Sequence, residues 1–221
     1  MLVTKCTEAD RRELLTPLVS LGLPVLWHAA SSTSAFAIAY DGDRRRMIVE
    51  ALGEPWSPEE ARGWVARALA GVEWVHVAPL ARSDFPSETL AELARGRRLS
   101  LDAQGLVRVP ETGELQVNAD YDPELLRHVW VLKVGDEEAD VLGDPTALGV
   151  REVLLTHGSR GSTVYVGGRA EPVPAYAFEG DPTGAGDAFS IAYIASRSAG
   201  LAPAAAARRA TAVVASVLAA A

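Results

Sequence analysis

The chain is poor in the residues that build disulfide frameworks and common metal clusters. Its 221 residues contain one cysteine, Cys6, and four scattered histidines, none of them spaced as His-x-x-x-His. A single cysteine excludes an internal disulfide and a cysteine-rich zinc site. The sequence therefore carries no obvious metal cluster.

Positive charge is also scarce. Lys and Arg number 21 against 29 Asp and Glu, which gives a net charge of −8, and the longest basic run is the three arginines 44–46. Proteins that bind nucleic acid by neutralising phosphates need basic stripes or patches. We therefore expect no nucleic-acid partner.

The ends of the chain lack long uninterrupted apolar runs. The first six residues show no basic region followed by an apolar stretch, as a secretory signal would. The most apolar stretch, 202–221, is mostly alanine and is interrupted by Arg208 and Arg209, so it predicts a packed helix, not a membrane span. We expect a cytoplasmic protein with no membrane partner.

The composition of the sequence is that of one globular domain. Hydrophobic residues make up 48% and charged residues 23%, with no linker-like stretch and no internal repeat. Residues 2–5 and 24–28 predict strands, and a capping pattern at 7–10 predicts a helix between them that ends at Gly22. Two extended runs around an Asp-Gly turn predict a β-hairpin over residues 34–52.

Strands and helices alternate in the rest of the chain. Ser57, followed by Pro58 and by Glu60 three residues on, predicts a capped helix that ends near Gly71. The pattern then predicts strands at 74–77, 99–101, 129–132, 152–156 and 163–166, the last leading into 172–178, and helices at 87–95, 123–128, 136–142, 184–199 and 203–221. This alternation predicts a single α/β domain over 1–221, with helices on both faces of a parallel sheet and the hairpin standing off it.

Residues 181–189 read Asp-Pro-Thr-Gly-Ala-Gly-Asp-Ala-Phe and open a predicted helix. Unpaired amides at a helix N-terminus attract phosphate oxygens, and glycines let the backbone approach a ligand closely. Asp187 would stand beside such a phosphate and accept a proton from an attacking hydroxyl. The same residues also fit a tight turn followed by a solvated acid. Neither a P-loop nor a Gly-x-Gly-x-x-Gly fingerprint is present.

This nine-residue segment resembles the C-terminal signature of the ribokinase-like (PfkB) family of carbohydrate and nucleoside kinases. Three further segments are similar to family motifs in the right order: 155–161 to its Thr-x-Gly-x-x-Gly turn, 132–139 to its Asn-x-x-Glu segment, and 101–105 to its mid-sheet Asp loop. The resemblance covers most of the chain, most strongly from about residue 99. It implies a three-layer α/β/α fold with a mostly parallel central sheet and a lid formed by the hairpin 34–52.

The resemblance implies a kinase that transfers phosphate from ATP, with Mg²⁺, to a hydroxyl of a sugar, a nucleoside or a similar small molecule. Asp187 would be the general base, and the amides of Gly184, Ala185 and Gly186 would form the anion hole. Asp102 would contact the acceptor at the carboxyl edge of the sheet.

The remaining implied roles concern the phosphate donor. Glu138 would organise Mg²⁺ through water. The residues that would line the ATP site are Lys133, Thr156, Gly158, Gly161 and Thr183.

Two departures from the family pattern qualify these roles. Gly135 stands where the motif has Asn, which removes a side chain from the expected Mg²⁺ network. Family members also begin with a further strand, a substrate-binding Asp and a Gly-Gly-x-x-x-Asn segment, and their last helix is followed by more chain. We therefore expect a fragment or a reduced family member. The alternatives are a non-catalytic nucleotide-binding or oligomerising domain and a flavodoxin-like domain without phosphate chemistry.

Two further expectations come from single residues. Phe36, Ile38 and Tyr40 alternate along the hairpin, and an apolar face of this kind invites association, so we expect a homodimer through the lid. His76 lies within a predicted strand, where a core histidine is the simpler interpretation.

Overall fold

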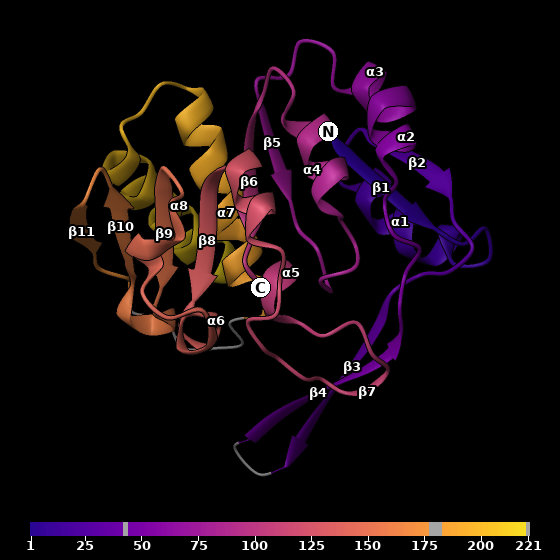
Figure 1. Ribbon diagram of the computed structural model, residues 1–221, viewed down its shortest axis with the longest axis horizontal. Helices are drawn as coiled ribbons and strands as arrows, with labels where there is room; N and C mark the ends of the chain where they lie inside the picture. Colours follow the sequence, from indigo (N-terminus) through magenta and orange to yellow (C-terminus); the bar gives the residue numbers. More distant parts are fainter. Residues whose placement is uncertain (42–43, 177–182, 220–221) are drawn as a thin grey trace.

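A six-stranded sheet forms the centre of the computed structural model, which describes residues 1–41, 44–176 and 183–219. The strand order is β11-β10-β9-β8-β6-β5 (Figure 1). Strands β5 (Trp74–Val77), β6 (Arg98–Asp102), β8 (Val129–Gly135) and β9 (Glu152–Thr156) are parallel. Strands β10 (Ser162–Val166) and β11 (Arg169–Val173) add an antiparallel hairpin. The mostly parallel sheet is thus confirmed.

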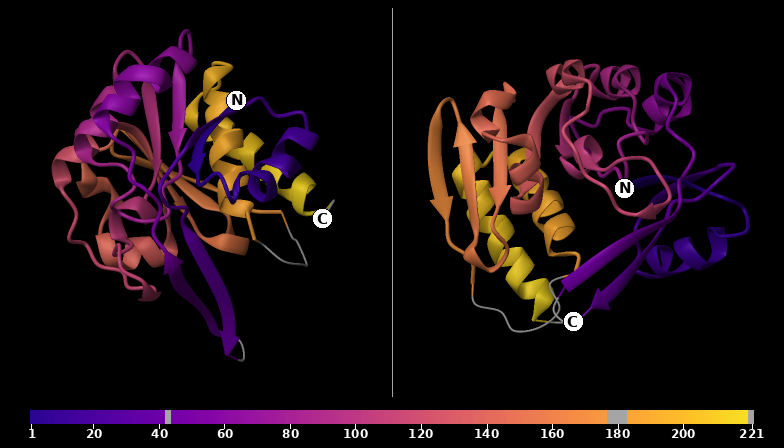
Figure 2. Two further views of the ribbon diagram at one scale, coloured as in Figure 1. Left: turned by 90° about the vertical axis from the view of Figure 1, so that its right-hand side faces the viewer. Right: turned by 60° about the horizontal axis from the view of Figure 1, so that its bottom comes forward.

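Helices cover both faces of this sheet, as expected for a three-layer α/β/α fold (Figures 1 and 2). Because side chains alternate along a strand, β6 and β8 send Leu99, Leu101, Leu132 and Val134 to one buried cluster. That cluster is covered by α4 (Ser87–Ala94) and by a helical segment made of α2 (Pro58–Glu60), a π-helical turn (Ala61–Val65) and α3 (Ala66–Ala68). The opposite face packs on α7 (Ala185–Ser198) and α8 (Pro203–Leu218).

The first part of the chain forms a separate parallel pair, β1 (Leu2–Cys6) and β2 (Val25–Ala29), joined by α1 (Arg11–Ser20). The sequence predicts a helix directly after residue 7, and this is wrong by about one turn. The Thr7 hydroxyl donates to Asp10 Oδ2 at 2.7 Å, and the Asp10 amide donates back to Thr7 Oγ1 at 3.2 Å. Both side chains are thereby used in a turn, and the helix begins only at Arg11.

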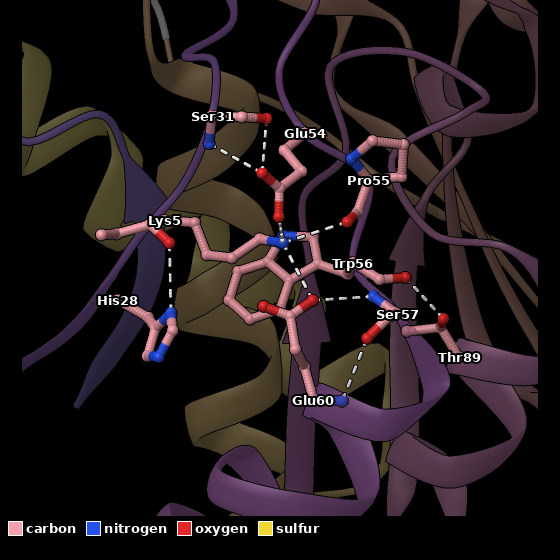
Figure 3. A network of polar contacts seen from close by, with 10 residues as sticks. Lys5, His28, Ser31, Glu54, Pro55, Trp56, Ser57, Glu60 and Thr89 are labelled. Atoms are coloured by element: carbon pink, nitrogen blue, oxygen red, sulfur yellow. Dashed lines mark hydrogen bonds and ion pairs between the residues drawn. The ribbon is translucent and has the colours of Figure 1, made fainter.

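Lys5 joins β1 to the helices beside it (Figure 3). Its side chain is 3% exposed, and its ammonium contacts Glu60 Oε2 at 2.9 Å, Glu54 Oε1 at 3.4 Å and the carbonyl oxygen of Pro55 at 3.0 Å. The ammonium also lies 5.0 Å from the centre of the Trp56 ring. Glu60 completes the predicted capping box with Ser57, so one carboxylate both caps α2 and holds Lys5. We call these residues the Lys5 cluster.

The predicted hairpin is formed by β3 (Ala35–Asp41) and β4 (Arg44–Ala51), to which the short strand β7 (Gly113–Glu114) adds. It stands off the central sheet, as predicted (Figures 1 and 2). Its turn at 42–43 lies outside the described residues. Of the alternating apolar residues, Ile38 is exposed and Phe36 is half-buried, while the side chain of Tyr40 is not described.

The remaining elements are short helical segments that lie between strands along the chain. They are α5 (Gln104–Val107), α6 (Asp136–Leu142) and three 3₁₀ turns at Pro123–His128, Pro145–Leu148 and Gly158–Arg160. The expected strand at 172–178 instead lies at Arg169–Val173, and residues 177–178 of that prediction fall outside the described part. In the described ranges no helix has the length and apolarity needed to cross a bilayer.

Candidate functional site

The carboxyl edge of the central sheet gathers most of the predicted site residues. Asp102 ends β6 and is opposite Lys133 of β8, and Gly135 at the end of β8 is opposite Thr156 at the end of β9. Carboxyl ends of parallel strands meet at one edge, where ligands of open α/β sheets bind. By alternation, Asp102 and Lys133 project to the face covered by α7, since their neighbours Leu101 and Leu132 belong to the other face.

Asp102 and Lys133 form a buried ion pair at this edge. Lys133 Nζ lies 3.2 Å from Asp102 Oδ2, and the two side chains are 12% and 3% exposed. The other oxygen of Asp102 accepts the amide hydrogen of Gln104 at 3.2 Å. The sequence placed Asp102 against the acceptor and Lys133 against the nucleotide, and did not foresee that they pair.

Helix α7 begins directly above this pair. Gly184, with φ +81°, is the residue before the helix, and this left-handed conformation explains why a glycine stands there. The first backbone bond of the helix runs from the Ala188 amide to the Gly184 carbonyl at 2.9 Å. The amides of Ala185, Gly186 and Asp187 therefore have no partner within the helix. They form the partially positive end of the helix dipole.

Gly186 brings the helix backbone close to Lys133. A Cβ added at Gly186 would lie 3.5 Å from Lys133 Nζ. Asp187 follows in the same turn, and it is exposed. The structure thus brings together Asp102, Lys133 and the start of α7. Thr183 is exposed just before this turn, and residues 181–182 of the sequence motif lie outside the described part.

His76 borders the same place, which the sequence did not indicate. Its Nδ1 lies 3.1 Å from Ser100 Oγ, and its Nε2 is buried with no hydrogen-bond partner among the described residues. Burial lowers the pKa of His76, although the charges of Asp102 and Asp187 oppose that shift. The imidazole is therefore neutral near pH 7 and adds no charge to the site. Only the β5–β6 register, which pairs His76 with Ser100, reveals this position.

A buried polar network holds the far end of α7 on the sheet. Glu152 of β9 accepts hydrogen bonds from Arg197 at 2.7 and 3.1 Å, from the Tyr193 hydroxyl at 2.6 Å and from Trp130 Nε1 at 3.2 Å. Burial and then the neighbouring Glu152 charge raise the pKa of Tyr193. Because two residues of α7 are anchored this way, the position of its N-terminus is fixed relative to the strands.

The turn after β9, which the sequence predicts to bind the phosphate donor, contains two glycines, and the packing of the fold requires one of them. Gly161 has φ +99°, and a Cβ there would lie 2.2 Å from the Val173 carbonyl oxygen, so the close approach of β11 requires glycine. Nothing described lies within 4 Å of the corresponding position at Gly158, whose φ is +55°. Thr156 donates its hydroxyl to the Val134 carbonyl at 3.2 Å. Gly158 therefore borders open space, whereas Gly161 does not.

Beside this turn, Asp136 holds His157 and Arg160. Asp136 Oδ1 lies 2.6 Å from His157 Nδ1, and Arg160 donates to Asp136 Oδ2 at 2.6 Å. The hydrogen bond with His157 lowers the pKa of Asp136, burial opposes this shift, and Arg160 adds to it. The carboxylate thus neutralises the positive charge that this turn would otherwise offer to a phosphate.

Glu138 is turned back onto its own helix. One of its oxygens, Oε2, accepts the amide hydrogen of Gly135 at the start of α6. A Cβ at Gly135 would meet this oxygen, the far end of a flexible side chain, which would have to shift to admit an Asn. No group of three or more His, Cys, Asp or Glu suited to a metal ion occurs among the described residues. Glu138 Oε1 remains available to hold a water of a hydrated Mg²⁺, which usually takes few protein ligands.

Comparison with known proteins gives matches along nearly the whole chain. A profile described as pfkB family carbohydrate kinase matches residues 22–220. The inositol 3-kinase of Zea mays is 34% identical over 114 residues, which are 49% of this chain and 30% of that protein. The inositol 3-kinase of Oryza sativa subsp. japonica is 37% identical over 113 residues, 46% of this chain and 28% of that protein. The matched segment thus spans less than a third of these relatives.

Solved structures give the same picture for the fold. A sulfate complex of a pyrophosphate-dependent kinase in the ribokinase family has a TM-score of 0.84 at 25% identity, covering 98% of this chain and 80% of that chain. A complex of such a kinase with a pyrophosphate analog and myo-inositol has a TM-score of 0.81 at 26% identity, covering 98% and 79%. The ribokinase of Thermotoga maritima, at 19% identity and a TM-score of 0.73 over 98% of this chain and 73% of that one, is similar in fold alone.

Proposed function

Because the chain belongs to the pfkB family of carbohydrate kinases and has the ribokinase-like α/β fold, we propose that it transfers a phosphoryl group to a hydroxyl of a small cyclic polyol or sugar. ATP with Mg²⁺ is the proposed donor. Two similar proteins are described as inositol 3-kinases and two similar structures as pyrophosphate-dependent, so myo-inositol is the first acceptor to test and pyrophosphate the second donor.

One observation carries this proposal: an exposed carboxylate, Asp187, lies in the first turn of α7 beside amides that have no partner in the helix. In the proposed reaction the acceptor hydroxyl gives its proton to Asp187 as its oxygen forms a bond to the transferring phosphorus. The bond from phosphorus to the donor's bridging oxygen breaks in the same step. The amides of Gly184, Ala185 and Gly186 stabilise the charge on the transferring group.

The donor is proposed to lie along the ends of β8 and β9. Thr156, Gly158 and Thr183 border this space, and Gly161 shapes the turn that bounds it. When bound, Mg²⁺ would neutralise charge on the donor phosphates, with Glu138 Oε1 holding one of its waters. The hairpin β3–β4 is the proposed lid over the acceptor, and a homodimer through its exposed side, where Ile38 lies, remains a proposal.

A second candidate function is a non-catalytic nucleotide-binding or oligomerising domain. The observation that favours it is the contact between Glu138 and the Gly135 amide, which withdraws one carboxylate oxygen from any metal. The same contact joins Glu60 to the Ser57 amide, so Glu138 caps the start of α6 as Glu60 caps α2. The two functions differ in whether an acceptor hydroxyl binds beside Asp187 and gives it a proton.

The test is turnover with ATP or pyrophosphate and a panel of inositols, sugars and nucleosides. Asp187→Asn keeps the size of the side chain but cannot accept the proton, so we expect turnover to fall by about 10²–10⁴-fold with little change in donor affinity. Asp140→Asn, which removes another exposed acid, from α6, is the matched control and should leave turnover unchanged. An active parent with an equally active Asp187→Asn variant contradicts the mechanism. A parent that binds donor and phosphorylates nothing in the panel supports the second function.

A further inference from the structure

We propose that His157 is a positioning residue of the phosphate-donor site. Its imidazole, held between Asp136 and Thr163, sets the orientation in which the turn 156–161 presents its backbone to the donor. This inference rests on the proposed function, because the turn borders the donor site proposed there. It gives a role to two side chains, His157 and Thr163, to which the sequence assigned none.

The imidazole of His157 joins three elements at the carboxyl edge of the sheet. Its Nδ1 lies 2.6 Å from Asp136 Oδ1 at the start of α6, and its Nε2 lies 3.1 Å from Thr163 Oγ1 at the start of β10. A carboxylate only accepts, so in the neutral ring Nδ1 carries the hydrogen and Nε2 accepts that of the Thr163 hydroxyl. Both ring nitrogens are thereby used within the protein, and neither is left for a ligand.

The middle of the turn has few other side-chain restraints. At its ends, Thr156 donates its hydroxyl to the β8 backbone at 3.2 Å, and Gly161 packs directly against the β11 backbone. Between these ends, His157 and Arg160 have the side chains that form hydrogen bonds to other described residues, and that of Arg160 is 74% exposed. The backbone bonds within the turn fix its internal shape. The contacts of His157 to α6 and β10 fix its orientation relative to the sheet.

Orientation matters at this turn because the turn offers an anion little positive charge. The Asp136 carboxylate holds the Arg160 guanidinium at 2.6 Å. Glu137 and Glu138 follow in the first turn of α6 and add negative charge. Gly158 has no side chain, and nothing described lies within 4 Å of the position that a Cβ would occupy there. The turn therefore presents backbone to the donor, and hydrogen bonds from backbone weaken steeply when their direction changes.

Replacing the ring nitrogens with carbon tests the proposal kinetically. His157→Phe keeps an aromatic ring but loses both hydrogen bonds. With the donor and acceptor that the parent turns over, we expect the donor KM to rise at least about tenfold, and kcat and the acceptor KM to stay within about threefold. The melting temperature should stay within about 4 °C of the parent, since His157 is partly exposed. His128→Phe, at the opposite edge of the sheet, is the control. An unchanged donor KM, or a lowered kcat at unchanged donor KM, overturns the proposal.

Two substitutions at Thr163 separate positioning from direct contact with the donor. Thr163→Val is also β-branched and suits strand β10, but it cannot donate to Nε2 of His157. Thr163→Ser keeps the hydroxyl and is the matched control. We expect the donor KM to rise about three- to tenfold in the valine variant at unchanged kcat, and to stay within about twofold in the serine variant. A valine variant whose donor KM is unchanged or lower, as direct binding by a freed Nε2 would give, overturns the proposal.

Hydrogen exchange tests the orientation of the turn without any need for turnover. The amides of Arg160 and Gly161 donate to backbone carbonyls within the turn at 3.1 and 3.2 Å. We expect both to exchange at least about tenfold faster in His157→Phe than in the parent, with the amides of β9 unchanged. Equal exchange rates in the two proteins contradict the proposal.

Calorimetry with Mg-ATP and with pyrophosphate keeps this inference distinct from the proposed function. We expect His157→Phe to bind the donor at least about tenfold more weakly than the parent does. Binding that depends on His157 in a parent without turnover supports the inference and contradicts the proposed function. Turnover in a parent whose donor binding is unchanged by His157→Phe contradicts the inference alone. A parent that binds neither donor and turns nothing over overturns both.

Discussion

The chain has two lysines, Lys5 and Lys133, and both are nearly buried, yet their surroundings differ. The ammonium of Lys5 contacts two carboxylates and a carbonyl, one acceptor for each of its N–H groups (Figure 3). That of Lys133 contacts one carboxylate within the described part of the chain. A buried cation whose donors are all satisfied is explained by the fold alone, whereas one with donors left over is a candidate for binding a ligand.

The elements around the two lysines support this distinction. Lys5 lies where β1 meets the capped start of α2, and Glu60 serves both the cap and the ion pair. Lys133 lies at the carboxyl edge of the main sheet under a helix N-terminus, and it has no capping role. A substitution at Lys5 should therefore change stability first, and one at Lys133 should change ligand binding and turnover first.

The largest effect on stability is expected from Lys5→Met. Removing the ammonium leaves Glu54 and Glu60 side by side with no cation, and breaking a buried pair typically costs about 3–5 kcal/mol. Because Glu54 is 37% and Glu60 19% exposed, we expect the lower part of that range or slightly less, about 2–3 kcal/mol. Urea unfolding monitored by tryptophan fluorescence measures it, with Arg209→Met as the surface control. A loss no larger than that control would remove the basis for the comparison.

A smaller effect, of opposite sign on stability, is expected from Gly186→Ala. Alanine favours a helix over glycine, so the free energy of unfolding should rise by up to about 1 kcal/mol. The added methyl group would stand 3.5 Å from Lys133 Nζ and cover the side of the ammonium that faces α7. We expect turnover to fall about tenfold, the equivalent of one weakened hydrogen bond to a charged group. Paired measurements of unfolding and kcat test this, and a variant that is both more stable and fully active would contradict the role of Lys133.

The smallest effect on the free energy of unfolding is expected when the pH is lowered. Hydrogen bonds from the Ser31 side chain and amide lower the pKa of Glu54 to about 2, and hydrogen bonds from Ser57 and Lys5 lower that of Glu60 despite its burial. A carboxylate with a lowered pKa in the folded state stabilises the fold above its ordinary pKa of about 4.3, and this stability is lost as pH falls toward 2. Since the Glu54 side chain is 37% exposed, solvent screens its interactions, and its share is less than about 1 kcal/mol. Unfolding followed from pH 6 to pH 3 should show a smaller loss in Glu54→Gln than in the parent.

The elements that the sequence predicted well are those set by local pattern. The capping box at Ser57, the alternation along 99–101 and the helix after Gly184 depend on near neighbours, and each lies where expected. The position of β11 differs from the prediction because four of the five residues of Arg169–Val173 are exposed, so the strand has no alternating pattern and owes its conformation to pairing with β10. The start of α1 was misplaced because Thr7 and Asp10 bond to each other.

The residues of the candidate site also fall into two groups, those that a local motif reveals and those that only long-range packing brings together. The glycines and Asp187 at the start of α7 are contiguous in the sequence, so a motif reveals them. The Asp102–Lys133 pair depends on the register between β6 and β8, which includes an irregularity between Leu99 and Ser100. The position of His76 beside Ser100 depends on the register between β5 and β6. Registers of strands far apart in the chain follow from the packed fold, so no local pattern predicts them.

The burial of both lysines also determines which chemistry the surface of this protein offers. Among the side chains that the structure describes, the exposed positive charge is carried by guanidinium groups, because the 21 basic residues are 19 arginines and these two nearly buried lysines. Enzymes that attach acetyl groups or ubiquitin to lysine side chains need an accessible ε-amine. The folded chain presents neither lysine freely to them, so such modification should report unfolding of the Lys5 cluster or opening of the sheet edge at Lys133.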